Sequence, residues 1–210
     1  MDIFEAIETR RSVRKYKPDV PPLEDLNILI NSARLAPSPN NSQMWHFLGI
    51  YSPEIRARLK QAIIENYDRI KGYPEAKDSQ ERIEYYKEFS TFFTEAPLCI
   101  AVLMEPQSSL IIEILKDRGL SPEEIERSRP HPDIMGVGAA VQNLMLAATS
   151  LGYGSCWLTA PIYAHEGLEE ILNVKSPYRL VSFVSIGKPD DNAPLERNKK
   201  ELGEILTVIR

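Results

Sequence analysis

The sequence has little of what several large classes of protein need. Of its 210 residues, only two are cysteines and three are histidines. Cys99 in PLCIAV and Cys156 in GSCWL have apolar neighbours, which predicts buried, reduced thiols and no disulfide. His46, His131 and His165 are scattered, without the spacing to cysteines or carboxylates that a metal site needs. We therefore expect no metal centre.

Long apolar runs and an excess of positive charge are missing too. No apolar stretch approaches the length of a transmembrane helix, and the start, MDIFEAIETRR, lacks the pattern of a signal peptide. The 30 acidic residues outnumber the 25 basic ones and give a net charge of −5, which argues against broad binding of nucleic acid. We expect a cytoplasmic protein that binds neither membranes nor nucleic acid.

The common motifs of side-chain catalysis are also missing. The sequence contains no G-x-S-x-G, no Walker loop and no G-x-G-x-x-G. No nucleophile or acid–base pair stands out, so no side chain is predicted to be catalytic. This pattern is typical of a protein whose bound cofactor carries the chemistry.

What is present is a mixture of helix and strand patterns. Apolar spacing and proline positions predict helices at 2–8, from Pro22, from Pro53 and over 134–150. Short apolar runs predict strands at 46–52, 97–103, 155–158 and 179–187. The polar stretch 105–131 suits short helices, one of them capped by Ser121. Strands scattered among helices predict the α+β class.

The stretch 65–92 differs from the rest in being polar, charged and rich in tyrosine. Its helical periodicity is weak, which favours a mobile surface excursion or lid. We therefore expect a single domain over 1–210 that carries a lid-like excursion at about 65–92.

Basic side chains cluster in TRRSVRKY, residues 9–16. If this segment is extended, Arg10, Ser12 and Arg14 point to one side and Arg11 points to the other. Two guanidinium groups flanking a hydroxyl suit a phosphate, because arginine matches phosphate oxygens with two hydrogen bonds. The alternative is that these cations offset the dipole of the preceding helix and otherwise remain solvated.

Two further segments offer polar contacts. The loop PSPNNSQMW, 37–45, carries Asn41 and Gln43, whose amides donate and accept as the pyrimidine end of a flavin requires. Asn and Ser are also ordinary turn formers. Near the C-terminus, Arg197 and Lys199 repeat the two-residue spacing of the basic segment, and their alternative role is a solvated tail.

In this order, the segments resemble the FMN-dependent nitroreductase family. The matching parts are the R-x-S-x-[RK] motif at 10–14, the PSxxNxQPW-like loop at 37–45, the long helix at 134–150, and the basic pair Arg197 and Lys199 before ELGEIL. The resemblance covers essentially the whole chain.

The resemblance implies a nitroreductase-like fold, with a central, mostly antiparallel sheet flanked by helices. It implies an intertwined homodimer, with FMN at the interface and the helix 134–150 paired across the dimer axis. The implied activity is that of an FMN-dependent oxidoreductase. NADH or NADPH reduces the flavin, and a small-molecule acceptor such as a nitroaromatic or quinone then reoxidises it in a ping-pong mechanism.

The resemblance also implies cofactor-binding residues. For the phosphate and ribityl chain they are Arg10, Arg11, Ser12, Arg14, Arg197 and Lys199. The loop from the partner chain would contribute Pro37, Ser38, Pro39, Asn41 and Gln43. The backbone near the reactive N5 atom of the ring would be that of Leu158, Thr159 and Ala160.

The sequence departs from the family pattern in three places. Met44 replaces the usual proline, LTAP at 158–161 stands where many members carry glycine, and 85–95 lacks the Asn and Lys that some members use to contact the flavin. Two alternatives to this activity stay open. One is a specialised member of the family, such as a reductive dehalogenase or a flavin-fragmenting enzyme. The other is a flavin store or sensor with little turnover.

Overall fold

Strand β2 (Leu98–Met104) is the centre of the fold in this computed structural model, which describes residues 1–190 and 199–210. Every residue of β2 is buried. Its even-numbered side chains join one apolar cluster, while Cys99, Ala101 and Leu103 join a second cluster on the other face of the sheet. A strand that is apolar on both faces needs cover on both, which explains the continuous apolar run at 97–103.

Within residues 1–190 and 199–210 the sheet has four strands in the order β1-β2-β4-β3, all paired antiparallel. The other strands are β1 (Trp45–Ile50), β3 (Gly154–Leu158) and β4 (Arg179–Gly187). The expected α+β class and antiparallel sheet are therefore confirmed. β1 ends earlier than predicted because Ser52 caps the next helix, its hydroxyl oxygen accepting from the Ile55 amide at 3.2 Å.

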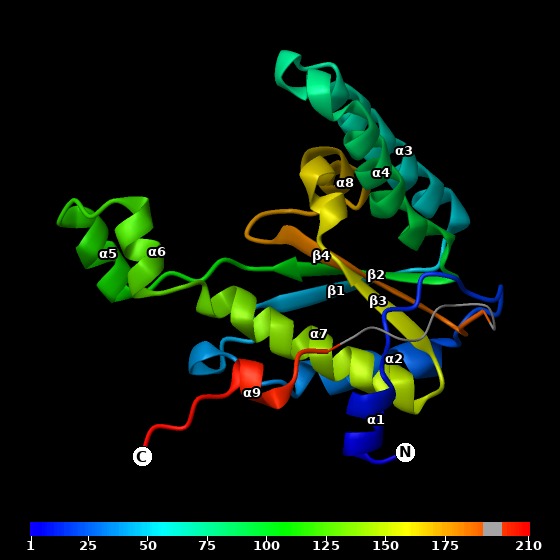
Figure 1. Cartoon of the computed structure of the whole chain (residues 1–210), viewed down its shortest axis with the longest axis horizontal. Coiled ribbons are helices and arrows are strands. Elements are labelled where there is room, and N and C mark those ends of the chain that lie inside the picture. Colours follow the sequence, from blue (N-terminus) through cyan, green and yellow to red (C-terminus); the bar gives the residue numbers. More distant parts are fainter. Residues whose placement is uncertain (191–198) are drawn as a thin grey trace.

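Helices cover both faces of this sheet (Figure 1). α2 (Leu23–Arg34) and α7 (Pro132–Ser150) pack on one face, and α1 (Ile3–Thr9) contacts α7. α3 (Pro53–Lys71) and α8 (His165–Ile171) cover the other face. The sheet is thus enclosed by helices, as the resemblance implies.

The remaining described elements are short. The helices are α4 (Gln80–Thr91), α5 (Leu110–Asp117), α6 (Pro122–Ser128) and α9 (Leu202–Ile205). The 3₁₀ turns are η1 (Pro39–Asn41), η2 (Pro74–Ser79), η3 (Phe92–Glu95) and η4 (Ala160–Ala164). As expected, Ser121 caps α6, and its hydroxyl oxygen accepts from the Glu124 amide at 3.3 Å.

The segment 65–92, where weak periodicity predicted a surface excursion or lid, is largely helical. α3 continues to Lys71, and α4 packs back along it as the second arm of a hairpin (Figure 1). Two ion pairs join the arms: Lys87 Nζ lies 2.8 Å from Asp68 Oδ1, and Lys71 Nζ lies 2.9 Å from Glu84 Oε2. Within α4, Lys87 Nζ also lies 2.6 Å from Glu84 Oε1. The hairpin keeps charged side chains on its inner side, which weakens its apolar pattern.

The cysteines behave as predicted, since both are free and buried. Burial raises the pKa of the Cys99 thiol to about 12, so the thiol stays protonated at neutral pH. In the part of the chain that the structure describes, no helix is both long and apolar enough to cross a membrane. The cytoplasmic location and the lack of nucleic-acid binding stay predictions.

Candidate cofactor site

The basic segment runs along the free edge of β3. Ser12 forms a parallel bridge with Ser155, and the Val13 amide donates to the Ser155 carbonyl at 2.9 Å. Val13 is buried against Gly154, where an added Cβ would lie 2.6 Å from the valine side chain. Gly154 therefore permits this close approach. The segment is extended, as the two-residue spacing requires.

Arg14 is held against aromatic rings and keeps an unused donor. Its guanidinium carbon lies 5.6 Å from the ring centroid of Phe89 and 5.9 Å from that of Phe92. Nη1 donates to the Ser12 carbonyl at 3.2 Å, whereas Nε is buried without a partner among the described residues. A buried donor without a partner is costly, so an anionic ligand suits this position.

Arg10 and Arg11 differ in availability. Arg10 is half-buried, and its side chain has no hydrogen bond or ion pair with the described residues. Arg11 turns back on α1, where its Nη1 donates to the carbonyls of Glu8 and Arg10. The alternative interpretation, cations offsetting the end of a helix, therefore describes Arg11. Its contact with a cofactor stays a prediction.

The other end of β3 carries the second predicted segment. Leu158 is buried in the core, Thr159 is exposed and Ala160 is half-buried. The side chain of Leu158 thus joins the core cluster and does not face a ligand. From Ser155 to Thr159 the chain covers about 13 Å at the rise of a strand. The point where Ser12 pairs with Ser155 is therefore roughly this distance from the turn at 159–160.

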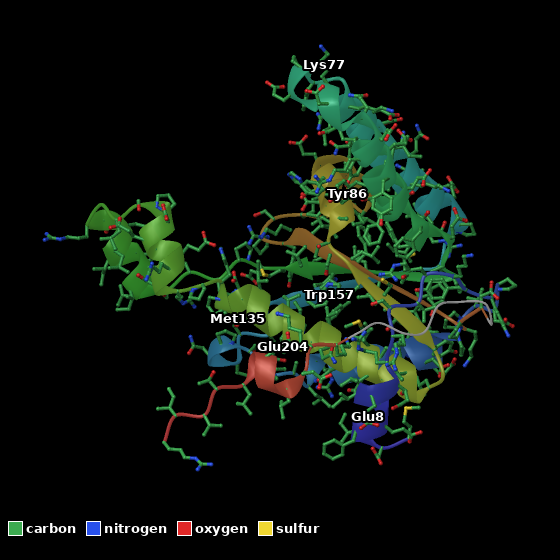
Figure 2. The ribbon with its side chains drawn as sticks, viewed as in Figure 1. Glu8, Lys77, Tyr86, Met135, Trp157 and Glu204 are labelled. Carbon is green, nitrogen blue, oxygen red and sulfur yellow. The ribbon has the colours of Figure 1, made fainter. Side chains whose placement is uncertain are left out.

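A cleft of about 720 Å³ opens beside this turn. It is bounded by the α3–α4 hairpin, η4 and the start of β4, and its lining residues are Tyr67, Ile70, Ile83, Tyr86, Phe89, Thr159, Ala160, Ile162, Tyr163 and Val181. Figure 2 labels Tyr86 on the hairpin. None of these lining residues is charged, and four are aromatic. Such a lining suits a flat, apolar ring with a few polar atoms.

The residues of α4 in this cleft were not predicted individually. Ile83, Tyr86 and Phe89 follow one another at three-residue intervals, so they lie along one face of the helix. That spacing is the signal that could have identified them. Phe89 also contacts Arg14, and it thereby joins the cleft to the basic segment.

The predicted loop lies far from the basic segment of the same chain. The loop lies at the start of α7, where an added Cβ on Gly136 would lie 3.4 Å from Pro39. The basic segment lies beyond the end of α7, because Ser12 pairs with β3, the strand that follows this helix. α7 has 19 residues and is therefore about 28 Å long. One chain thus does not bring the loop and the basic segment together.

The loop itself is closed and exposes its amides. The backbone N–H of Gln43 donates to Ser38 Oγ at 3.1 Å. Asn40, Asn41 and Gln43 have φ values of 53°, 52° and 45°, in the left-handed region that asparagine tolerates better than glutamine. Asn41 and Gln43 are exposed, while Met44, which replaces the usual proline, is buried against Gly136.

The remaining predicted residues contribute less here. Lys199 is exposed, and Arg197 lies outside the described residues. The described residues contain no group of three or more His, Cys, Asp or Glu side chains that could hold a metal. The ring of His46 packs on the ring of Tyr178, and their centroids lie 5.3 Å apart.

Comparison with curated proteins gives relatives over almost the whole chain. Protein DrgA of Synechocystis is 30% identical over 98% of this chain and 92% of its own. An iodotyrosine deiodinase of Thermotoga neapolitana is 26% identical over 91% of both chains.

Solved structures agree with this fold. A BluB-like flavoprotein from Clostridium difficile is 30% identical and superposes over the full length of both chains with a TM-score of 0.90. A nitroreductase with bound FMN from Bacteroides fragilis is 22% identical, also over both full lengths, with a TM-score of 0.74.

The sequence profile described as "Nitroreductase family" matches residues 7–188. The expected family and fold are thereby confirmed, and so is NAD(P)H-dependent chemistry on FMN at the level of the family. The chain belongs to the nitroreductase family, whose members are NAD(P)H-dependent flavoprotein oxidoreductases.

Proposed function

We propose that this protein binds FMN and uses NADH or NADPH to reduce small aromatic electron acceptors, such as nitroaromatics or quinones. One observation carries the proposal. The basic segment with its unused arginine donors and the turn at 159–160 lie at the two ends of β3, and an aromatic cleft adjoins that turn.

The residues present fit the cofactor. Arg10, Ser12 and Arg14 would hold the phosphate, because Arg10 and the buried Nε of Arg14 have no partner among the described residues. The backbone of Thr159 and Ala160 would lie beside the flavin ring. Bound FMN would supply the redox chemistry, accepting a hydride from NAD(P)H and passing electrons to the acceptor. The protein would orient both molecules in turn.

We infer that the site is completed in a homodimer. The loop 37–43 of a second copy would supply the contacts that one chain cannot bring to its own basic segment. Ile134, Met135 and Trp157 are 45%, 61% and 40% exposed, and Figure 2 labels the latter two. The apolar side chains of the C-terminal tail are also exposed, namely Leu202, Ile205, Leu206, Val208 and Ile209. So many exposed apolar side chains favour burial against a partner.

Reductive dehalogenation is the second candidate, because the deiodinase relative and the aromatic cleft both favour an aromatic substrate. The cleft offers only tyrosine and threonine hydroxyls and backbone groups to a charged substrate. A zwitterionic amino acid would therefore be bound less well than a neutral ring. We accordingly place neutral nitroaromatics and quinones first.

The test begins with the absorption spectrum of the purified protein, which should show flavin bands. Without oxygen, NAD(P)H alone should bleach these bands, and a benzoquinone added afterwards should restore them. Initial-rate plots at several acceptor concentrations should be parallel, since both substrates use one pocket in turn. Faster turnover of 3-iodotyrosine than of the quinone would favour the second candidate. Bound flavin without turnover of any acceptor would indicate a store or sensor.

A further inference from the structure

Two neighbouring side chains of α3 hold the turn that follows β3. Asn66 Nδ2 donates to the Tyr163 carbonyl at 3.1 Å, and the Tyr67 hydroxyl lies 3.5 Å from the Ala160 carbonyl oxygen. These two carbonyls belong to the first and fourth residues of η4, which starts directly after Thr159. α3 therefore fastens the turn at both of its ends.

The Tyr67 hydroxyl belongs to a longer chain of hydrogen bonds. Tyr67 is 5% exposed and Ser90 on α4 is fully buried, with 2.9 Å between their hydroxyl oxygens. A phenol has one proton, so the consistent arrangement has Ser90 donating to Tyr67 and Tyr67 donating to Ala160. Burial raises the pKa of Tyr67, which keeps that proton in place. The chain joins α4, α3 and η4.

Asn66 is fixed in a similar way. Arg69 Nη2 donates to Asn66 Oδ1 at 2.6 Å, which leaves the amide nitrogen of Asn66 to face the Tyr163 carbonyl. Asn66 itself is only 9% exposed. Because both its oxygen and its nitrogen are paired, the buried side-chain amide of Asn66 has one orientation. It therefore fixes the position of the Tyr163 carbonyl in the turn.

We propose that Tyr67 and Asn66 are positioning residues, which set the place of the Thr159–Ala160 backbone beside the flavin ring. The proposal rests on the proposed function, because that function places FMN at this turn. Tyr67 also lines the cleft with its ring. The same helix thus couples the shape of the acceptor cleft to the backbone that contacts the cofactor.

The first test uses the protein without cofactor. Tyr67→Phe removes only the hydroxyl, so amide hydrogen exchange over 160–165 should become about fivefold faster. Asn66→Ala should do the same. The matched control is Tyr153→Phe, which also loses a hydroxyl bond, 2.6 Å long, to Asp25 on α2, away from η4. The control should leave exchange over 160–165 unchanged.

The second test uses the protein loaded with FMN. Tyr67→Phe should shift the flavin absorption bands and slow flavin reduction by NAD(P)H about tenfold, because misplacement by a fraction of an ångström lowers the rate of a positioned reaction. The Kd for FMN should change less than twofold, since the phosphate contacts are intact. Ser90→Ala added to Tyr67→Phe should cause no further loss, as expected for two members of one chain.

The outcomes separate the claims. Unchanged exchange over 160–165 in both Tyr67→Phe and Asn66→Ala would overturn the fastening of the turn. Faster exchange with unaltered flavin bands and reduction rate would overturn the positioning role. A native protein that binds no FMN would overturn the proposed function and the positioning role together, whatever the exchange result.

Discussion

At the scale of single residues, Arg10 and Arg14 carry the phosphate hypothesis. Arg10→Ala or Arg14→Ala should each weaken FMN binding roughly 10- to 100-fold, because each removes a charge-assisted contact worth about 1.5–3 kcal/mol. The measurement is the FMN dissociation constant from quenching of flavin fluorescence. Riboflavin, which has no phosphate, should show a much smaller change in the same variants.

Arg11 provides the comparison within the same segment. Its guanidinium is engaged with the end of α1, so Arg11→Ala should lower thermal stability slightly and weaken FMN binding less than Arg14→Ala does. If the Arg11→Ala protein lost FMN more readily than the Arg14→Ala protein, Arg11 and not Arg14 would be the arginine that binds the phosphate.

The histidines test the claim that no side chain is catalytic. Replacing His46, His131 or His165 by Ala, one at a time, should leave the rate of flavin reduction by NAD(P)H within about twofold of the native rate. Stopped-flow absorbance under anaerobic conditions measures this rate. Loss of flavin reduction in a variant that still holds FMN would reveal an essential protein acid or base.

The basic residues also show the limits of sequence reasoning. The phosphate interpretation assumed an extended segment, and the structure shows one, with Ser12 bridged to Ser155 and Val13 buried. It could not show that Arg11 folds back while Arg14 reaches Phe89 and Phe92, because both are arginines in one short segment. Which arginine stays available depends on long-range packing, and local spacing contains no information about α4.

At the scale of elements, the α3–α4 hairpin depends on charge. Hydrogen bonds from Lys87 and then Lys71 hold the pKa of Glu84 below its usual range. A carboxyl group with a lowered folded pKa stabilises the structure above its unfolded pKa, about 4.3, and this stabilisation is lost as the pH falls through the folded value. Hydrogen exchange over 66–91, corrected for the intrinsic rate, should therefore accelerate below about pH 4.

The substitution Glu84→Gln should imitate this loss at pH 7 and remove the acceleration at low pH. Its matched control is Glu95→Gln, which removes the carboxylate from an ion pair with Lys60 outside the hairpin contact. Equal exchange in the native and Glu84→Gln proteins at pH 7 would show that the ion pairs of Glu84 do not hold the hairpin.

The same hairpin shows where the sequence indicated no individual elements. β2, α7 and the cap at Ser121 were predicted well because apolar runs and capping residues are local signals. The helices of 65–92 bury few side chains and pair through charges, so their apolar periodicity is faint. The sequence indicated a lid-like excursion there, but not the cleft that these helices help to form.

At the scale of the whole molecule, the chain should form a dimer. Sedimentation at micromolar concentration should report about twice the 23.9 kDa of one chain. Deleting 202–210 should shift the protein toward monomer and loosen FMN, because the deletion removes exposed apolar side chains expected to lie on the partner. A full-length monomer that still retains FMN would contradict the shared site.

The central claim is that this molecule recognises the phosphate of FMN, and the most direct test compares two flavins that differ in that group alone. FMN and riboflavin should be titrated separately into the cofactor-free protein, with fluorescence quenching as the readout. We expect FMN to bind at least about 100-fold more tightly, through two or more charge-assisted contacts. Equal dissociation constants for the two flavins would contradict the account.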